Sequence, residues 1–237
     1  MIFNLDKDLI NMKPLTIVWF NTLEYTPIQL TSYLIGIGLW TIVYVFTIKN
    51  IFKNRFCEIP GAALSGKFAW EILWSFHAVP NMGFIFEIGY KLWLILDIVI
   101  VLGFFCYGYK QVISQVNQYF RIYFIFGILF WLITLYFFIN DGFDNLIGSN
   151  SFYVLNILMS VLYIFMFLRL ENEYKKLFSS VIAWTKCFGT GFISLMVYLK
   201  WPNNNWVTAL GIICFLIDFY YIFLVNTFKK RYQIEDS

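Results

Sequence analysis

Two carboxylates lie inside long apolar stretches of the chain, where a charged side chain is energetically unfavourable. Glu71 lies about ten residues into the apolar run Gly61–Val79, with Trp70 and Trp74 beside it. Asp218 lies in the sequence FLIDFYYIFL, near the other end of the chain. A charged side chain at the centre of a bilayer costs about 2.5–3.5 kcal/mol on insertion scales, so such residues usually face the interior of a helical bundle and have a function. We therefore expect both acids to meet in one cavity.

The chemistry that suits such acids is proton donation. A buried carboxyl group that stays protonated at neutral pH acts as a general acid. Glu71 has Lys67 one helical turn away and could simply pair with it, whereas no basic residue lies within four positions of Asp218. The local environment therefore favours Asp218 slightly as the donor and Glu71 as the group that holds or recharges it. The role of Lys186, which also lies in an apolar run, stays open.

Aromatic residues are the second unusual feature, since Phe, Tyr and Trp make up 22% of the chain. Ring faces stabilise a desolvated cation by about 2 kcal/mol or more per contact. A buried acid with an aromatic lining suits a reaction that begins with protonation and proceeds through carbocations. The residues expected to bind the substrate are Asp97, Trp70, Trp74, Trp93, His77, Asn156, Trp184, Phe219 and Tyr221.

Three of these polar residues have simpler explanations. Asp97 could reach water or cap a neighbouring helix, and His77 could lie at the membrane interface. Asn156 could hold two helices together, as buried amides often do in membranes. We expect all three towards the outer side of the bundle, with Glu71 and Asp218 at the floor of the pocket.

The composition places these residues in a membrane protein. Hydrophobic residues make up 60% of the 237 positions and charged residues 13%, against about 25% charged in a soluble domain. The apolar runs are about 17–23 residues long and continuous, which fits membrane helices and not the short alternating strands of a barrel. The sequence predicts an all-α integral membrane protein. Its membrane would be the cell membrane in a bacterium and the endoplasmic reticulum in a fungus.

The chain divides into three parts. Residues 1–27 form an N-terminal interfacial segment, in which Leu15–Phe20 is expected to be a short helix anchored by Trp19 and Tyr25. Residues 28–228 form a seven-span membrane domain, and residues 229–237 form a charged tail. The spans are expected at about Ile28–Ile48, Gly61–Val79, Lys91–Tyr109, Tyr119–Ile139, Phe152–Leu168, Leu177–Leu199 and Trp206–Phe228.

Positive charge predicts the orientation of these spans. Of the 17 lysines and arginines, eleven lie at the ends and connections of one side, four lie on the other side, and Lys67 and Lys186 lie within spans. Cytoplasmic loops carry the excess of positive charge. The N-terminus is therefore expected outside and the C-terminus in the cytoplasm.

Residue spacing gives no sign of a metal site. The single histidine and the four cysteines form no CxxC or HxxxH pattern, so buried free thiols are the expected state of the cysteines. No DDxxD or DxDD sequence is present either, and Asp141 and Asp144 are expected to lie in a solvated turn. We predict no metal and no cofactor.

Four short motifs, in order along the chain, resemble those of the membrane-integral terpene cyclases of meroterpenoid and indole-diterpene biosynthesis, known from fungi and with shorter bacterial relatives. The second span carries Ala69-Trp70-Glu71, and the third opens with Lys91-x-Trp93-x-x-x-Asp97. The sixth has Trp184-x-Lys186-x-x-Gly189-Thr190, and the seventh has Ile217-Asp218-x-x-Tyr221. Nothing in residues 1–27 matches.

The resemblance implies a seven-span, metal-independent enzyme that protonates a terminal epoxide or alkene of a polyprenyl chain attached to a non-terpene head group. It also implies that Glu71 and Asp218 are the residues needed for activity. The substrate would be a prenylated or epoxy-prenylated phenol, pyrone or indole, and nucleic acid would not be a partner. A small seven-span transporter, or a sensor without enzymatic activity, is the alternative, although the five prolines lie outside or at the edges of the spans.

Overall fold

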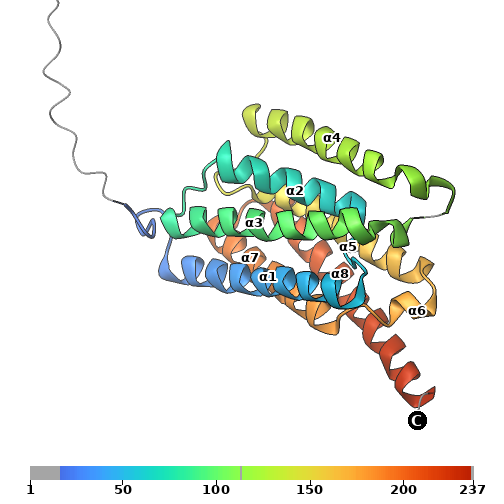
Figure 1. Ribbon diagram of the computed structural model, residues 1–237. Helices are drawn as coiled ribbons and strands as arrows, with labels where there is room; N and C mark the ends of the chain where they lie inside the picture. The colour runs from blue at the N-terminus through green and yellow to red at the C-terminus, as the bar shows by residue number, and fades with distance from the viewer. Residues whose placement is uncertain (1–16, 113, 236–237) are drawn as a thin grey trace, which may run out of the picture.

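The computed structural model describes residues 17–112 and 114–235, and these residues form helices and turns without a strand (Figure 1). The all-helical prediction is confirmed. The long helices are α1 (Pro27–Asn54), α2 (Gly61–Phe76), α3 (Phe84–Tyr107), α4 (Phe120–Asn140), α5 (Ser149–Arg169), α7 (Ser180–Lys200) and α8 (Asn205–Glu235). The short helices are η2 (Gly108–Gln111), η3 (Ser114–Tyr119) and α6 (Asn172–Lys175).

Six helices of the described chain are long and apolar enough to cross a membrane. Helix α2 has 16 residues and is therefore about 24 Å long, less than the hydrocarbon core of about 30 Å. It ends at Phe76 and not at Val79, since Pro80 biases the residue before it away from the helical conformation. The seventh span and the orientation of the termini stay predictions.

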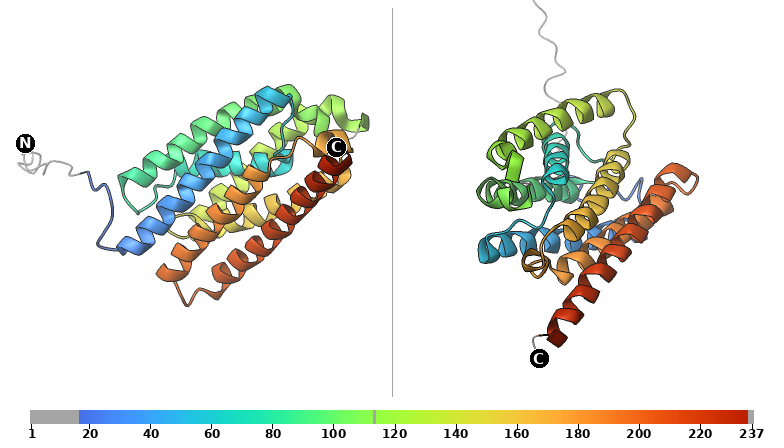
Figure 2. Two further views of the ribbon diagram at one scale, coloured as in Figure 1. Left: turned by 90° about the horizontal axis from the view of Figure 1, so that it is seen from below. Right: turned by 90° about the vertical axis from the view of Figure 1, so that its right-hand side faces the viewer.

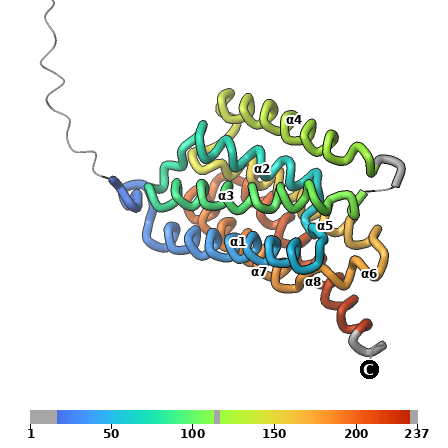
Figure 3. Tube along the Cα trace, in the orientation of Figure 1, coloured from blue at the N-terminus to red at the C-terminus, as the bar shows by residue number. Residues whose placement is uncertain are grey.

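Six of the long helices close into a ring around the core. Helix α2 packs on α3, α3 on α1, α1 on α7, α7 on α8, α8 on α5, and α5 returns to α2. Helix α4 packs against the outside of α2 and lies at the edge of the bundle (Figures 1 and 2). The tube in Figure 3 shows that short connections join most neighbouring helices. This arrangement encloses a space between α1, α2, α3 and α5.

The closest packing within the ring joins α1 and α7, and it depends on small residues. A Cβ atom added to Gly36 would lie 2.6 Å from Ile193 Cγ1 and 3.0 Å from the Gly189 carbonyl oxygen. Without side chains at these two glycines, the backbones approach closely, as in many membrane helix pairs. This approach brings the inner face of α1 towards the centre of the bundle.

Helix α3 begins at Phe84, seven residues before the expected start at Lys91. Glu87 lies in its first turn, where a negative charge interacts favourably with the helix dipole, and pairs with Lys91 at 2.5 Å. The earlier start changes the depth of Asp97, which lies near the middle of the helix and not in its outer part.

The two ends of the chain also differ from expectation. Residues 17–26 form bends and turns, so the helix expected at Leu15–Phe20 is wrong over its described part, and residues 15 and 16 lie outside the described chain. Tyr25 is buried and donates a hydrogen bond of 2.5 Å to Asn81 Oδ1, while Trp19 is exposed. At the other end, α8 continues through most of the expected tail to Glu235.

Candidate active site

Glu71 lies in a buried cluster of three charged side chains and one phenol. Lys67, one turn earlier on α2, lies 3.4 Å from Glu71 Oε1 and also hydrogen-bonds Asp97 Oδ1 of α3. Tyr44 of α1 donates a hydrogen bond to Glu71 Oε1, and the Lys67 ammonium lies 3.7 Å from the centre of its ring. All four side chains are buried. Two carboxyl groups therefore share one lysine, and the cluster is neutral when one of them carries a proton.

Six aromatic rings form a closed belt beside this cluster. In order around the belt, neighbouring ring centres lie 5.4–6.4 Å apart, within the range of attractive ring pairs. The rings come from α1, α2, α3 and α5, so four helices must assemble before the belt exists. Its members are Trp70, Phe152, Trp40, Tyr44, Trp93 and Tyr90.

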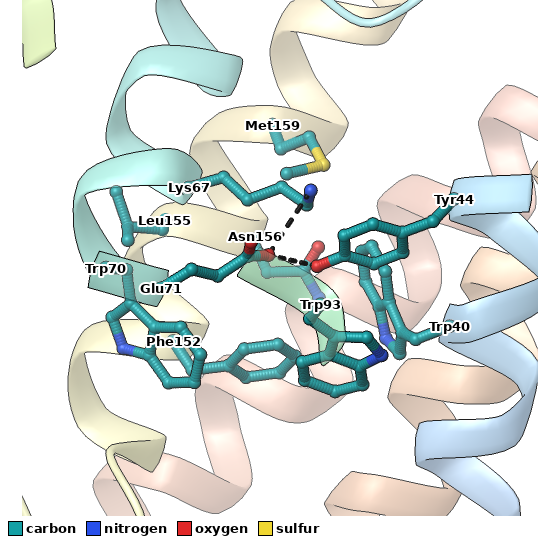
Figure 4. Close-up of a pocket in the computed structure, with 10 residues that line it drawn as sticks. All are labelled: Trp40, Tyr44, Lys67, Trp70, Glu71, Trp93, Phe152, Leu155, Asn156 and Met159. Carbon is teal, nitrogen blue, oxygen red and sulfur yellow. Dashed lines mark hydrogen bonds and ion pairs between the residues drawn. The ribbon is translucent and has the colours of Figure 1, made fainter. Parts of the chain in front are cut away.

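Five rings of the belt, all except Tyr90, line a cavity of about 30 Å³ together with Lys67 and Glu71 of the charged cluster (Figure 4). This is room for one water molecule. Three lining residues have a buried polar atom without a hydrogen-bond partner: Trp40 Nε1, Glu71 Oε2 and Asn156 Oδ1. Buried polar atoms are almost always paired, so these atoms point to a polar ligand or water. The lining consists of Trp40, Tyr44, Lys67, Trp70, Glu71, Trp93, Phe152, Leu155, Asn156 and Met159.

Asp218 lies in a second buried ion pair. Lys186 of α7 donates hydrogen bonds to Asp218 Oδ1 of α8 at 2.5 Å and to Ser160 Oγ of α5 at 2.7 Å. The Lys186 ammonium lies 5.9 Å from the centre of the Trp40 ring, so this pair stands behind one wall of the cavity. Asp218 itself is not among the lining residues. No basic residue lies close to Asp218 in the sequence, and its partner Lys186 belongs to a different helix, α7.

The structure brings together part of the residue set expected from the sequence. Glu71, Trp70, Trp93 and Asn156 line the cavity. Asp97 lies next to Glu71, because both carboxylates contact the ammonium group of Lys67. Trp74 does not line the cavity. Its ring stacks on that of Trp70, with 5.9 Å between the ring centres.

Four expected residues lie elsewhere. His77 is exposed and bonds Asn140 Oδ1 at 3.0 Å, so it lies at one end of the bundle. Trp184 and Phe219 are 37% and 53% exposed on the outer face of α7 and α8, where their rings contact each other edge to face. Tyr221 is buried, but it packs on Tyr163 and not on the belt.

Sequence reasoning missed the contribution of α1 and most of that of α5. Trp40 and Tyr44 are four residues apart and therefore share one face of α1, and both are buried. This spacing, in a span with few other aromatic positions, was the available signal. Phe152 and Met159 gave no comparable signal, because apolar residues occur throughout the membrane helices.

Among the described residues, no three or more His, Cys, Asp and Glu side chains gather in a group that could hold a metal ion. All four cysteines are free. The donors around the cavity are carboxyl, amide, indole and phenol groups next to a lysine, and a nearby ammonium group disfavours a second cation. The expectation that no metal takes part stays a prediction.

The fold and the site together define a class of protein: a helical membrane bundle that encloses a buried acid within a belt of aromatic rings. The family model of the Pyr4-like transmembrane terpene cyclases matches residues 21–231. The chain therefore belongs to this family of membrane-integral terpene cyclases, and the family resemblance expected from the four motifs is confirmed. No curated protein matches the chain. No solved structure matches it either.

Proposed function

We propose that this membrane terpene cyclase starts the cyclisation of a polyprenyl or epoxy-polyprenyl chain by donating a proton from Glu71. The chain would be attached to an aromatic head group such as a phenol, pyrone or indole. The observation that carries the proposal is the state of the two Glu71 oxygens. Oε1 accepts a hydrogen bond from Tyr44 and contacts Lys67, whereas Oε2 has no partner and belongs to a residue that lines the cavity. Oε2 is thus the oxygen that is available to carry a proton towards a substrate in the cavity.

Charge balance favours Glu71 over the other two acids as the donor. Lys186 balances Asp218 one to one, so that pair is neutral with the carboxyl group ionised. Lys67 faces both Glu71 and Asp97, and one of these two carries the extra proton. Glu71 lines the cavity and Asp97 does not. The preference for Asp218 drawn from its local sequence is therefore reversed in this proposal, because its base comes from α7.

The proton would pass from Oε2 to the terminal epoxide oxygen, the bond from that oxygen to the tertiary carbon would break, and a tertiary cation would form. Successive double bonds then attack the cation and form carbon–carbon bonds, and loss of a proton from the last cation gives a product isomeric with the substrate. The new Glu71 carboxylate is stabilised by the Tyr44 hydroxyl and by Lys67, 3.4 Å away. Ring faces of the belt stabilise the cation.

An epoxide fits the unpartnered atoms better than an alkene does. An alkene brings no polar atom, so Trp40 Nε1 and Asn156 Oδ1 would stay unpaired, at a cost of about 1–3 kcal/mol each. An epoxide oxygen accepts from the indole N–H, and the hydroxyl group formed from it can donate to the amide oxygen.

We propose that Asp218 is a positioning residue, since with Lys186 it joins α5, α7 and α8 behind Trp40.

Product analysis tests this function directly. Membranes containing the protein are incubated with matched prenylated and epoxy-prenylated phenols, pyrones and indoles, and the products are separated and identified by mass spectrometry. We expect a cyclic product of unchanged mass from an epoxide, unaffected by EDTA, and at least about a hundredfold slower product formation in membranes containing Glu71→Gln. Conversion of no substrate in the panel would oppose the proposed chemistry, and conversion by Glu71→Gln at the normal rate would oppose the proposed donor.

We also propose that α2 is the seventh span and that the N-terminus lies outside. The excess of lysines and arginines at one end of the bundle supports this orientation. A cysteine placed at Gly142, in the turn between α4 and α5, should react with an impermeant maleimide added to intact cells, and one at Glu173 in α6 should react only after lysis. The reverse pattern would invert the topology.

A further inference from the structure

A second and larger cavity opens between α4 and α5, over the surface of α2. Its volume is about 760 Å³, within the range of about 300–1,000 Å³ that is usual for ligand sites. Helix α4 packs chiefly against α2, and this leaves its side towards α5 uncovered. We call this space the α4–α5 cleft. Its apolar walls include Phe124 and Trp131 of α4 and Leu162 and Met166 of α5.

One end of the cleft is polar and positively charged. Arg169, at the last turn of α5, hydrogen-bonds the Gln111 carbonyl oxygen and lines the cleft together with Gln111. The guanidinium group has five N–H donors, and Arg169 is exposed, so donors remain for a head group. This is the end of the bundle where α2 and α4 begin and α3 and α5 end.

The other end of the cleft reaches the wall of the candidate active site. Trp131 lines the cleft and Leu155 lines the cavity around Glu71. Both meet at Gly66 of α2, where an added Cβ atom would lie 2.7 Å from Leu155 Cδ2 and 3.1 Å from Trp131 Nε1. Gly66 is one residue before Lys67, so these two side chains stand between the cleft and the charged cluster.

The cleft also provides the space that a polyprenyl chain needs and that the cavity at Glu71 lacks. The cavity at Glu71 has room for one water molecule, which is far too little for a polyprenyl chain. Along α4 the cleft runs from Phe120 to Trp131, which are 11 residues apart and therefore separated by about 16 Å of helix. A chain of several isoprene units can lie in this space with its last unit at the wall of the cavity.

We infer that the α4–α5 cleft binds the polyprenyl chain of the substrate, which enters sideways from the bilayer. The polar head group lies at Arg169, the chain lies along α5, and movement of Leu155 and Trp131 admits the terminal unit to Glu71. This inference rests on the proposed function, because it assumes that the protein turns over a prenylated substrate.

Substituting a residue at the open side of the cleft tests the inference. Ala62 lines the cleft and is exposed, so Ala62→Phe adds bulk without displacing packed atoms. Ala209→Phe is the matched control, because Ala209 is exposed on α8 and lines neither cavity. We expect Ala62→Phe to lower kcat/KM at least about tenfold, with a loss that grows with the number of isoprene units, as each methylene group excluded from the cleft reduces binding. The control should keep the wild-type value.

A photoreactive substrate analogue gives a second measurement that does not depend on turnover. With a diazirine in the middle of its prenyl chain, the analogue should label peptides of α4 and α5 in the wild type and in Ala209→Phe, and label Ala62→Phe several-fold less. Labelling confined to α7 and α8, or equal kcat/KM in the two variants, would overturn the inference. So would a phospholipid, detected by native mass spectrometry, that holds the cleft and is not displaced by the analogue. If wild-type protein converts no prenylated substrate, the proposed function fails, whereas normal conversion that Ala62→Phe does not slow refutes the cleft alone.

Discussion

At the scale of single residues, the decisive feature is the number of acids that each lysine balances. Lys186 faces one carboxyl group, and Lys67 faces two. Burying an ion without a partner costs several kcal/mol, so a buried cluster with an excess acid retains a proton. In the proposed mechanism, this imbalance of charge keeps a proton on Glu71, next to rings that would stabilise the cation formed when the proton leaves.

This imbalance predicts the effects of substitutions around Lys67. Glu71→Gln should fold and lose about 10²–10⁴-fold in turnover, the usual contribution of a positioned acid. Asp97→Asn should also lose most activity, although Asp97 does not line the cavity, because Lys67 then favours an ionised Glu71. Adding Lys67→Met to Asp97→Asn leaves Glu71 neutral again and should restore part of the turnover, measured as product formed per folded protein. A double variant no more active than Asp97→Asn would contradict the charge argument.

At the scale of helices, two contacts hold α7 in place: its close approach to α1 and its ion pair with α8. The pair Lys186–Asp218 is buried, and Lys186 also reaches Ser160 of α5. Removing one partner of a buried pair usually costs about 3–5 kcal/mol, whereas replacing both by apolar residues is often neutral. The same pair stands behind Trp40, so its loss should disturb the aromatic belt.

We therefore expect Lys186→Met to lower the thermal stability of the detergent-solubilised protein strongly, and the double variant Lys186→Met/Asp218→Leu to recover most of it. If Asp218 only positions other residues, the double variant should also recover part of the turnover lost in Lys186→Met. A stable double variant with no turnover would instead identify Asp218 as a proton-transferring residue. The comparison separates the two roles because folding and activity are measured on the same preparations.

The close approach of α1 and α7 gives a matched pair of glycine substitutions. Gly36→Ala places a methyl group 2.6 Å from Ile193 Cγ1, and overpacking of this kind costs about 1–3 kcal/mol. Gly38→Ala meets nothing within 4 Å, so it should leave the unfolding temperature unchanged or raise it. Because α1 carries Trp40 and Tyr44, we expect Gly36→Ala also to reduce turnover. Equal unfolding temperatures for the two variants would contradict the close approach.

At the scale of the whole molecule, one buried acid outside the helices should make stability depend on pH. Glu58, between α1 and α2, is buried and accepts hydrogen bonds from Asn50 Nδ2 at 3.0 Å and from the Ser179 backbone N–H at 3.5 Å. Burial raises the pKa of Glu58 from 4.5 to about 8, although these two bonds and the nearby Lys229 act in the opposite direction. The folded protein thus binds a proton at Glu58 more tightly than the unfolded chain does.

The sign of the effect follows from this difference. Its contribution to the free energy of unfolding is complete below the unfolded pKa of 4.5 and is lost as the pH rises through the folded pKa of about 8. The total loss is roughly 3–5 kcal/mol, given about 1.4 kcal/mol per pKa unit. Wild-type protein in detergent should therefore melt at a lower temperature at the alkaline end of this window. Glu58→Gln keeps the same neighbours without ionising and should flatten the dependence, while an unchanged pH slope would contradict the assignment.

The sequence by itself determined the kind of molecule and indicated the residue on which the proposed mechanism depends. Continuous apolar runs require helices in a membrane, because lipid provides no hydrogen-bond partner for an open backbone, and six of the expected spans appear as helices of sufficient length. The carboxylate in the second apolar run, Glu71, was noticeable because a charged side chain in the middle of a bilayer is unfavourable in free energy. Glu71, Trp70, Trp93 and Asn156 do line one cavity, although the catalytic role of Glu71 stays a proposal.

Only the tertiary structure decided which residues complete the site. Lys186 lies 32 positions from Asp218, and Tyr44 lies 27 positions from Glu71, so no local pattern indicates these partners. Likewise, Trp184 and Phe219 are aromatic residues in the expected spans, but the rotation of α7 and α8 turns them outward. The face that a membrane helix presents to its neighbours is set by close packing, such as that at Gly36. Apolar residues cover both faces of these helices, so the sequence alone gives only a weak indication of which face points towards the neighbouring helices.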